Sequence, residues 1–167
     1  MRIIQAPSNY EIDGYTVFMA GGMGDTFWHN VFFEELKDLP INILYPYNPN
    51  ISDIVQQIKW EFDGLHNYIN SKKFIFSCYF DYFTNQPVTM LELGKMLVLS
   101  QRKVLKNSFF AHQIVINEGF PCVVSFHKDA KLKHDIEIQC NLMNVIAKER
   151  TPKEHAQAVI KAYERLL

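Results

Sequence analysis

This chain of 167 residues has few cysteines, almost no excess of one charge over the other, and no long apolar runs. Its three cysteines, Cys78, Cys122 and Cys140, form no Cys-x-x-Cys pair and each lies in an apolar stretch, so we expect buried thiols in a reducing compartment. Seventeen basic residues stand against eighteen acidic ones, which excludes a general electrostatic attraction to nucleic acid or to anionic membranes. A small ligand is therefore the expected partner.

Signals for metal, membrane and export are also missing from the sequence. The six histidines never show His-x-x-x-His spacing, so we expect no metal site. No apolar run is long enough to span a bilayer, and the N-terminus lacks the basic start and apolar stretch of a signal peptide. We expect a cytoplasmic protein that needs no cofactor and binds neither membranes nor a nucleic-acid polymer.

Apolar segments typical of strands alternate along the chain with segments of helical periodicity. Strands are predicted at Arg2–Ala6, Tyr15–Ala20, Ile41–Tyr45, Lys73–Tyr79 and Cys122–Phe126. Helices are predicted at Phe27–Leu36, from Ser52, from near Met90 with breaks through Ile116, at Asp135–Ala147 and at Lys153–Leu167. This alternation predicts a single α/β domain over residues 1–167, with a mostly parallel sheet of four or five strands and helices on both faces.

The helix from Ser52 has a clear apolar repeat at spacings of three and four. The residues in this repeat, which we expect to face the core, are Ile54, Ile58, Phe62, Leu65 and Ile69. Trp60, in the segment Gln57-Ile-Lys-Trp-Glu61, lies away from that stripe. It is interpreted either as an anchor in an interface or as part of the wall of a site.

Ligands of parallel α/β sheets usually bind beyond the carboxyl ends of the strands. The segment Ala20-Gly-Gly-Met-Gly-Asp25 follows one predicted strand, and it has neither the spacing of a dinucleotide-binding turn nor the Gly-Lys-Ser/Thr ending of a phosphate-binding loop. Its glycines indicate either a tight turn or a close approach of the backbone to a ligand. A proline-rich loop after Tyr45 and the segment Asp81–Glu92 are expected at the same edge.

The segment Pro87-Val-Thr-Met-Leu-Glu-Leu-Gly94 allows two interpretations. Thr89 followed three residues later by Glu92 is a capping box, in which each side chain satisfies a backbone N–H of the other residue. Alternatively, a helix N-terminus holds Glu92 ionised so that the carboxylate can attack a sugar carbon. Gly94 is unusual inside a helix, and it suggests close packing against a neighbour.

Taken in order, these segments resemble the nucleoside 2-deoxyribosyltransferase family, in particular its "like" branch. The resemblance covers nearly the whole chain and is carried by Phe18–Gly22, Trp28, Asn48-Pro49, Gln57–Glu61, Pro87–Gly94, Pro121–His127 and Asp135–Gln139. It implies a flavodoxin-like α/β sandwich whose subunits associate and complete one another's active sites. It also implies that a 2-deoxyribosyl group is transferred between bases through an ester of Glu92.

The resemblance also implies which residues bind the nucleoside or nucleotide. These are Gly21, Gly22, Met23, Asp25 and Trp28 beside the nucleoside, Asn48 on the base side, and Asp135 near the sugar 5′ end, from the same or the neighbouring subunit.

Two features depart from the family pattern. Acidic residues usual in the family are replaced here, at Lys72-Lys73 and at Gln86. Because a departing base needs a proton, another acid is required, and Asp81 is the first candidate and Asp25 the second. Extra residues around Arg102–Ile116 are predicted to form a lid or an oligomer contact. Two other functions stay open: an N-glycosidase acting on nucleosides or their 5′-monophosphates, and a nucleotide-binding module without catalysis.

Overall fold

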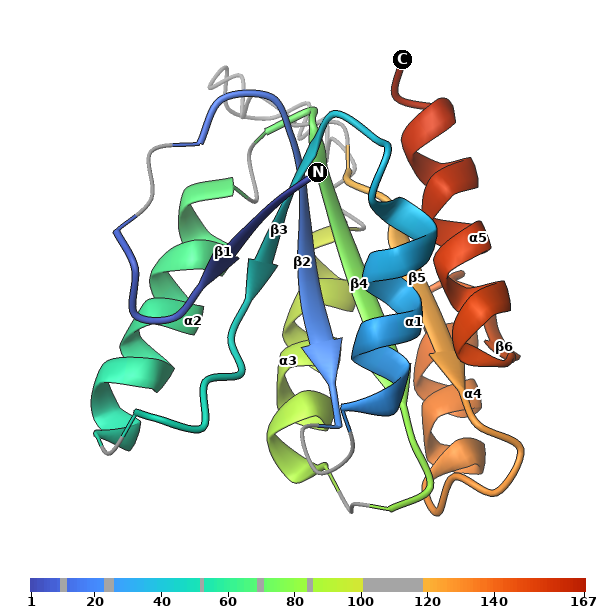
Figure 1. The fold of residues 1–167 in the computed structure, drawn as a ribbon. Helices are drawn as coiled ribbons and strands as arrows, with labels where there is room; N and C mark the ends of the chain where they lie inside the picture. The colour runs from blue at the N-terminus through green and yellow to red at the C-terminus, as the bar shows by residue number, and fades with distance from the viewer. Residues whose placement is uncertain (10–11, 23–25, 52, 69–70, 84–85, 101–118) are drawn as a thin grey trace, which may run out of the picture.

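A computed structural model describes residues 1–9, 12–22, 26–51, 53–68, 71–83, 86–100 and 119–167. It contains a six-stranded sheet in the order β1-β3-β2-β4-β5-β6, in which all pairings are parallel (Figure 1). The strands are β1 (Arg2–Gln5), β2 (Tyr15–Gly21), β3 (Ile41–Tyr45), β4 (Phe74–Phe80), β5 (Cys122–Phe126) and β6 (Ala147–Glu149). The helices are α1 (Phe27–Leu36), α2 (Ile54–Tyr68), α3 (Pro87–Ser100), α4 (Lys133–Leu142) and α5 (Pro152–Glu164).

Helices cover the sheet on both faces, and alternate side chains of the strands enter two separate cores. Phe18, Phe76 and the strand residues that point to the same face pack with α2, α3 and α4. Val17, Ile75 and the strand residues that point to the other face pack with α1 and α5. All seven residues of β4 are buried, as expected of a central parallel strand covered on both sides. The α/β class and the flavodoxin-like arrangement are confirmed.

The sheet has one strand more than the sequence predicted. β6 falls partly in the segment that was expected to be the end of a helix over Asp135–Ala147, but α4 ends at Leu142. β6 has only three residues, and neither Lys148 nor Glu149 is buried, so it carries no apolar run that would mark a strand. Helix α3 begins at Pro87, three residues before the predicted start near Met90. The predicted continuation through Ile116 lies largely outside the described residues.

The predicted core stripe of α2 is wrong. Ile54, Ile58 and Phe62 are more than half exposed, and of the predicted stripe Leu65 is buried while Ile69 lies outside the described residues. Trp60 instead enters the core at 7% exposure, and its indole Nε1–H donates to the carbonyl oxygen of Ser8 at 2.8 Å. The helix is therefore rotated from the orientation that its periodicity suggested, and it presents apolar side chains outward.

The direction of the chain connections changes at one point of the carboxyl edge, between β2 and β4. From β2 the chain runs through α1 to β3, whereas from the adjacent β4 it runs through α3 to β5 on the other side. Connections that leave neighbouring strands in opposite directions open a crevice between them, which is the usual binding place in such sheets. In the part of the chain that the structure describes, no helix has the length and apolar character needed to cross a membrane.

Candidate functional site

A pocket of about 220 Å³ lies near this crevice, between α2 and α3. Its lining consists of Gly21, Pro46, Ile54, Gln57, Ile58, Glu61, Val88, Thr89 and Glu92. Pockets that enclose drug-sized ligands measure roughly 300–1,000 Å³, so this volume suits a pentose-sized group. The structure therefore brings Gly21 and Glu92, two of the predicted site residues, into one cavity.

The glycine turn after β2 is held by bonds within the protein. Trp28 Nε1–H donates to the Gly22 carbonyl oxygen at 2.9 Å, and His29 Nε2 lies 3.0 Å from the same oxygen. His29 Nδ1 lies 2.8 Å from the Tyr45 hydroxyl, which fits an imidazole with the proton on Nε2. The Gly22 N–H is directed to the Tyr79 carbonyl oxygen at 3.4 Å.

Neither glycine leaves room for a side chain without a shift of its neighbours, and at Gly21 the neighbour is backbone. Gly21 has φ +152°, and a Cβ there would overlap the Tyr79 carbonyl and approach the Trp28 ring to 2.7 Å. A Cβ on Gly22 would overlap the carboxylate of Asp81 and lie 2.7 Å from the amide nitrogen of Gln86. Of the two interpretations of this segment, the structure supports the tight turn. Met23 and Asp25 lie outside the described residues.

The predicted capping box is wrong. Thr89 is the third residue of α3 rather than its cap, it is 6% exposed, and its hydroxyl donates to the Gly21 carbonyl oxygen at 3.4 Å. Glu92 is the sixth residue of a helix whose first turn contains no acidic residue. The field of a helix N-terminus acts mainly within the first turn, so it does not account for an ionised Glu92 either.

Glu92 faces another carboxyl group across the pocket. The Glu61 side chain, from α2, is hydrogen-bonded to the Glu92 side chain. Gln57, one turn earlier on α2, donates its Nε2–H to Glu61 Oε1 at 3.0 Å. Two helices thus contribute a carboxyl pair with an amide behind it.

This pair is electrostatically strained. Burial raises the pKa of Glu92 above the usual range, and the negative charge and hydrogen bond of Glu61 raise it further, against a smaller opposing effect of Lys95. Burial also raises the pKa of Glu61, while its hydrogen bonds to Gln57 and Glu92 lower it. Two carboxylates at such short range do not both ionise readily, so the pair retains one proton near neutral pH.

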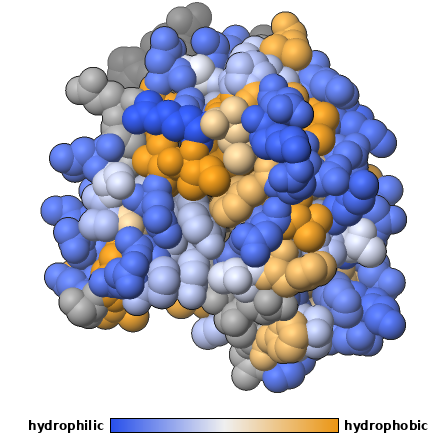
Figure 2. Space-filling model, in the orientation of Figure 1, coloured by the Kyte–Doolittle hydropathy of each residue, from blue (hydrophilic) through white to orange (hydrophobic). Residues whose placement is uncertain are grey.

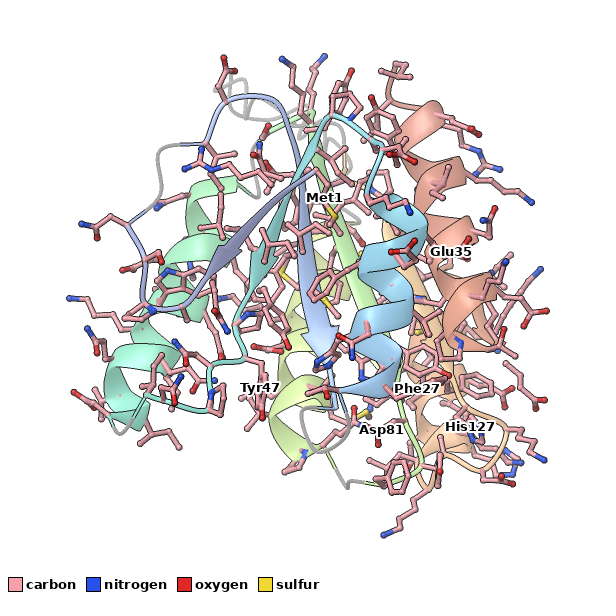
Figure 3. All side chains as sticks on the ribbon, viewed as in Figure 1. Met1, Phe27, Glu35, Tyr47, Asp81 and His127 are labelled. Carbon is pink, nitrogen blue, oxygen red and sulfur yellow. The ribbon has the colours of Figure 1, made fainter. Side chains whose placement is uncertain are left out.

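Asp81, the predicted acid, lies beside the pocket rather than in its lining. It follows β4 at the carboxyl end of the sheet (Figure 3), is 5% exposed, and accepts the Phe83 N–H on Oδ1 at 2.9 Å. Gln86, with φ +42°, is buried against Gly22 close to Asp81. Neither Nε2 nor Oε1 of Gln86 has a hydrogen-bond partner within the described chain, which is unusual for a buried amide.

Three further predicted residues lie away from the pocket. Trp28 is 3% exposed and belongs to the core under α1 and α5, on the opposite face of the sheet. Asn48 holds its own loop, because its Nδ2 donates to the Ala6 carbonyl oxygen at 2.7 Å and its Oδ1 accepts the Asn50 N–H. Asp135 is exposed in the first turn of α4. Within one copy of the described chain, these three residues do not join Glu92.

Gly94 does not pack tightly, contrary to the expectation from the sequence. Outside the backbone of its own helix, a Cβ at this position would meet Gln139 Oε1 at 4.0 Å. This is ordinary van der Waals contact, so packing does not require glycine here.

A larger hollow of about 740 Å³ lies along β5, β6 and α5. Lys148, Arg150 and Lys161 line it together with Glu149 and Glu154, and it contains none of the predicted site residues. Among the described residues no cluster of three or more His, Cys, Asp or Glu side chains is suited to hold a metal ion. The predicted site residues Gly21 and Glu92 thus lie in the smaller pocket and not in this hollow.

The sequence interpretation assigned no role to Gln57 and Glu61, although it marked the segment that contains them. Their separation of four residues places both side chains on one helix face, and this was the available signal. The fold and the pocket define an α/β protein with a pair of carboxyl groups in a pocket near the carboxyl edge of its sheet. Neither a scan against models of protein families nor a search of curated proteins finds a match to this chain.

Proposed function

We propose that this protein cleaves the N-glycosidic bond of 2′-deoxynucleosides and transfers the sugar to another base. An oxygen of the Glu92 carboxylate attacks C1′ as the bond from C1′ to the base nitrogen breaks, and the base leaves with a proton. The nitrogen of a second base then attacks C1′, and the Glu92 ester is released as carboxylate. Two displacements at one carbon retain its configuration.

The observation that carries this proposal is the position of Glu92. Its carboxyl group lines a pentose-sized pocket near the carboxyl ends of the central strands, where α/β sheets bind ligands. Glu92 is partly buried, and once it has lost its proton a poorly hydrated carboxylate is a stronger nucleophile. The ordered resemblance of the sequence to the deoxyribosyltransferases points to the same residue.

We further propose that a second copy of the chain completes the site. Side chains on α2 and α3 form an exposed apolar surface beside the pocket, which we call the α2–α3 surface; it consists of Ile54, Val55, Ile58, Phe62, Val88, Leu91 and Val98. Contiguous apolar surfaces of this kind mark association sites. The surface continues into the pocket, since Ile54, Ile58 and Val88 also line it. A second copy seated there would close the pocket on its open side.

Hydrolysis is the alternative outcome of the same ester. Glu61 lines the same pocket as Glu92, and its carboxyl group could take a proton from water as well as from a base, which would make the protein an N-glycosidase. The two functions differ only in whether water or a base receives the sugar. Incubation with a second base and analysis of the nucleoside products distinguishes them.

A covalent trap tests the proposal directly. A 2-fluoro-arabino nucleoside slows release of the sugar, so intact-protein mass should increase by one fluorinated sugar, located by peptide mapping on Glu92. Glu92→Gln should abolish both the adduct and turnover, and Glu34→Gln, an exposed position on α1, should affect neither. Binding of the nucleoside without an adduct would instead identify a nucleotide-binding module.

A further inference from the structure

The hydrogen bond between Glu61 and Glu92 indicates where the pair holds its proton. A hydrogen bond between two carboxyl groups needs one proton, because an ionised carboxylate only accepts. Gln57 contributes a second N–H to Glu61, and a donated hydrogen bond stabilises the charged form of its acceptor. In the ligand-free protein the proton therefore resides mainly on Glu92 and the charge mainly on Glu61.

This arrangement addresses two requirements of the proposed reaction at once. Glu92 must lose its proton to attack C1′, and the departing base must gain one. Asp81 does not line the pocket, whereas Glu61 does. The single proton held between the two carboxyl groups meets both needs if Glu61 receives it and passes it on.

We propose that Glu61 is the acid–base residue of this site, acting with Glu92 as nucleophile. The proton of Glu92 passes to Glu61, the Glu92 oxygen bonds to C1′ as the bond to the base breaks, and Glu61 gives the proton to the leaving nitrogen. In the second step Glu61 takes a proton from the incoming base or from water, and Glu92 is released. This inference rests on the proposed function, because it needs the Glu92 ester.

Entry of the sugar has to separate the pair. Nucleophile and acid–base carboxyl groups of retaining glycosidases lie about 5–5.5 Å apart, and two directly hydrogen-bonded carboxyl groups are closer than that. Glu61 and Glu92 belong to different helices and are both only partly buried, so side-chain rotation alone can part them. Breaking the hydrogen bond removes one cause of the raised pKa of Glu92, which favours the carboxylate once a ligand is bound.

The choice of leaving group tests this role. 2′-Deoxyadenosine needs a proton on its base as the bond breaks, whereas 7-methyl-2′-deoxyguanosine already carries a positive base and needs none. Glu61→Gln should slow the first substrate by about 10²–10⁴-fold and the second by less than about tenfold. With 2′-deoxyadenosine, the rate of the unchanged protein should fall at high pH, because the pair loses its proton there. This fall should be absent in Glu61→Gln. Glu92→Gln should abolish turnover of both substrates.

Equal loss of both substrates in Glu61→Gln would overturn the acid–base role and leave the proposed function standing. An unchanged protein that forms no adduct and cleaves neither nucleoside would overturn the proposed function, and this inference with it. Thermal unfolding establishes that the Glu61→Gln variant is folded. If it is not, Glu61→Asp replaces it, and this variant should keep the fall in the cleavage rate of 2′-deoxyadenosine at high pH. If the fall is absent while the variant still cleaves 7-methyl-2′-deoxyguanosine, the acid–base role of Glu61 is overturned.

Discussion

The hydroxyl of Thr89 donates to the carbonyl oxygen of Gly21, and this bond ties the first turn of α3 to the end of β2. Thr89→Val preserves the shape and removes the donor, so we expect a loss of about 1 kcal/mol in the free energy of unfolding. Urea denaturation measures it. Thr151→Val is the matched control, because Thr151 belongs to an observed capping box with Glu154 and should cost about 0.5–2 kcal/mol. An unchanged midpoint for Thr89→Val alone would contradict the role of this bond.

Two glycines should respond in opposite directions to alanine. Gly22→Ala forces a methyl group into the Asp81 carboxylate, so it should destabilise the fold by about 1–3 kcal/mol. Gly94→Ala enters ordinary contact on a helix, so it should stabilise by up to about 1 kcal/mol. Parallel thermal melts of the two variants check this. If Gly94→Ala also destabilised the fold, the open packing around Gly94 on α3 would be contradicted.

His155 should make the fold sensitive to acid. It is fully buried between the hydroxyls of Ser77 and Ser125, at 2.9 and 2.8 Å, and burial lowers its pKa to about 3, helped by the charge of Arg150. The unfolded chain binds a proton near the ordinary value of 6.5, whereas the folded chain does not. Stability is therefore fully present above about pH 6.5 and falls as the pH drops toward 3.

Denaturation from pH 7 to pH 4 measures this contribution. His155→Gln should lower stability at pH 7 and reduce the slope of stability against pH. His134→Gln is the control, because that side chain is 83% exposed and should leave the slope unchanged. An identical slope in His155→Gln would show that other groups cause the acid sensitivity.

Glu92 should act in the opposite direction at higher pH. Its folded pKa is raised above the ordinary value of 4.5, so the folded state holds a proton that the unfolded state has released. Its contribution to stability is fully present below about pH 4.5 and is lost as the pH rises through the folded pKa. Glu92→Gln should therefore flatten the decline in stability between pH 5 and pH 9, as urea denaturation at each pH measures. A decline as steep as in the unchanged protein would place the proton elsewhere.

The α2–α3 surface should control association. Leu91 is 77% exposed on α3, and Leu91→Glu should shift the protein toward monomer in sedimentation experiments, with a change in monomer stability within about 0.5 kcal/mol. Leu167→Glu, at 76% exposure near the C-terminus, should leave the assembly unchanged. An unchanged protein that is monomeric at every concentration would contradict the proposed assembly.

The sequence predicted the central strands well because their burial on both faces leaves long apolar runs. Where burial is incomplete the pattern is weaker. Figure 2 shows apolar side chains at the surface over β1, beside α1; none of the helices in the described ranges covers β1 on this face, and Ile3 is 43% exposed. The rotation of α2 was not predictable, because Ile58 and Trp60 are both apolar and periodicity does not say which face meets the sheet. In the fold Trp60 is the buried one of the two, and its indole bonds to Ser8, which is far away in the sequence.

The place of the candidate pocket was predictable, but its composition was not. The rule for carboxyl ends put the segments that contain Gly21 and Glu92 at one edge of the sheet, and the structure brings both residues into one pocket. The partner of Glu92 was missed because the contact joins two helices, and only the packed fold brings Glu61 across. Trp28 was assigned to the site through the resemblance to the deoxyribosyltransferases, but its ring lies in the core on the opposite face of the sheet.

The edges of the sheet have a consequence for the behaviour of this protein in solution. The central strands β2 and β4 have seven residues each, whereas the outer strands β1 and β6 have four and three. Arg2, Lys148 and Glu149 place charges on those short outer strands. Short, charged edge strands offer a strand of another molecule little backbone to pair with. The apolar centre of the sheet is therefore protected from edge-to-edge aggregation.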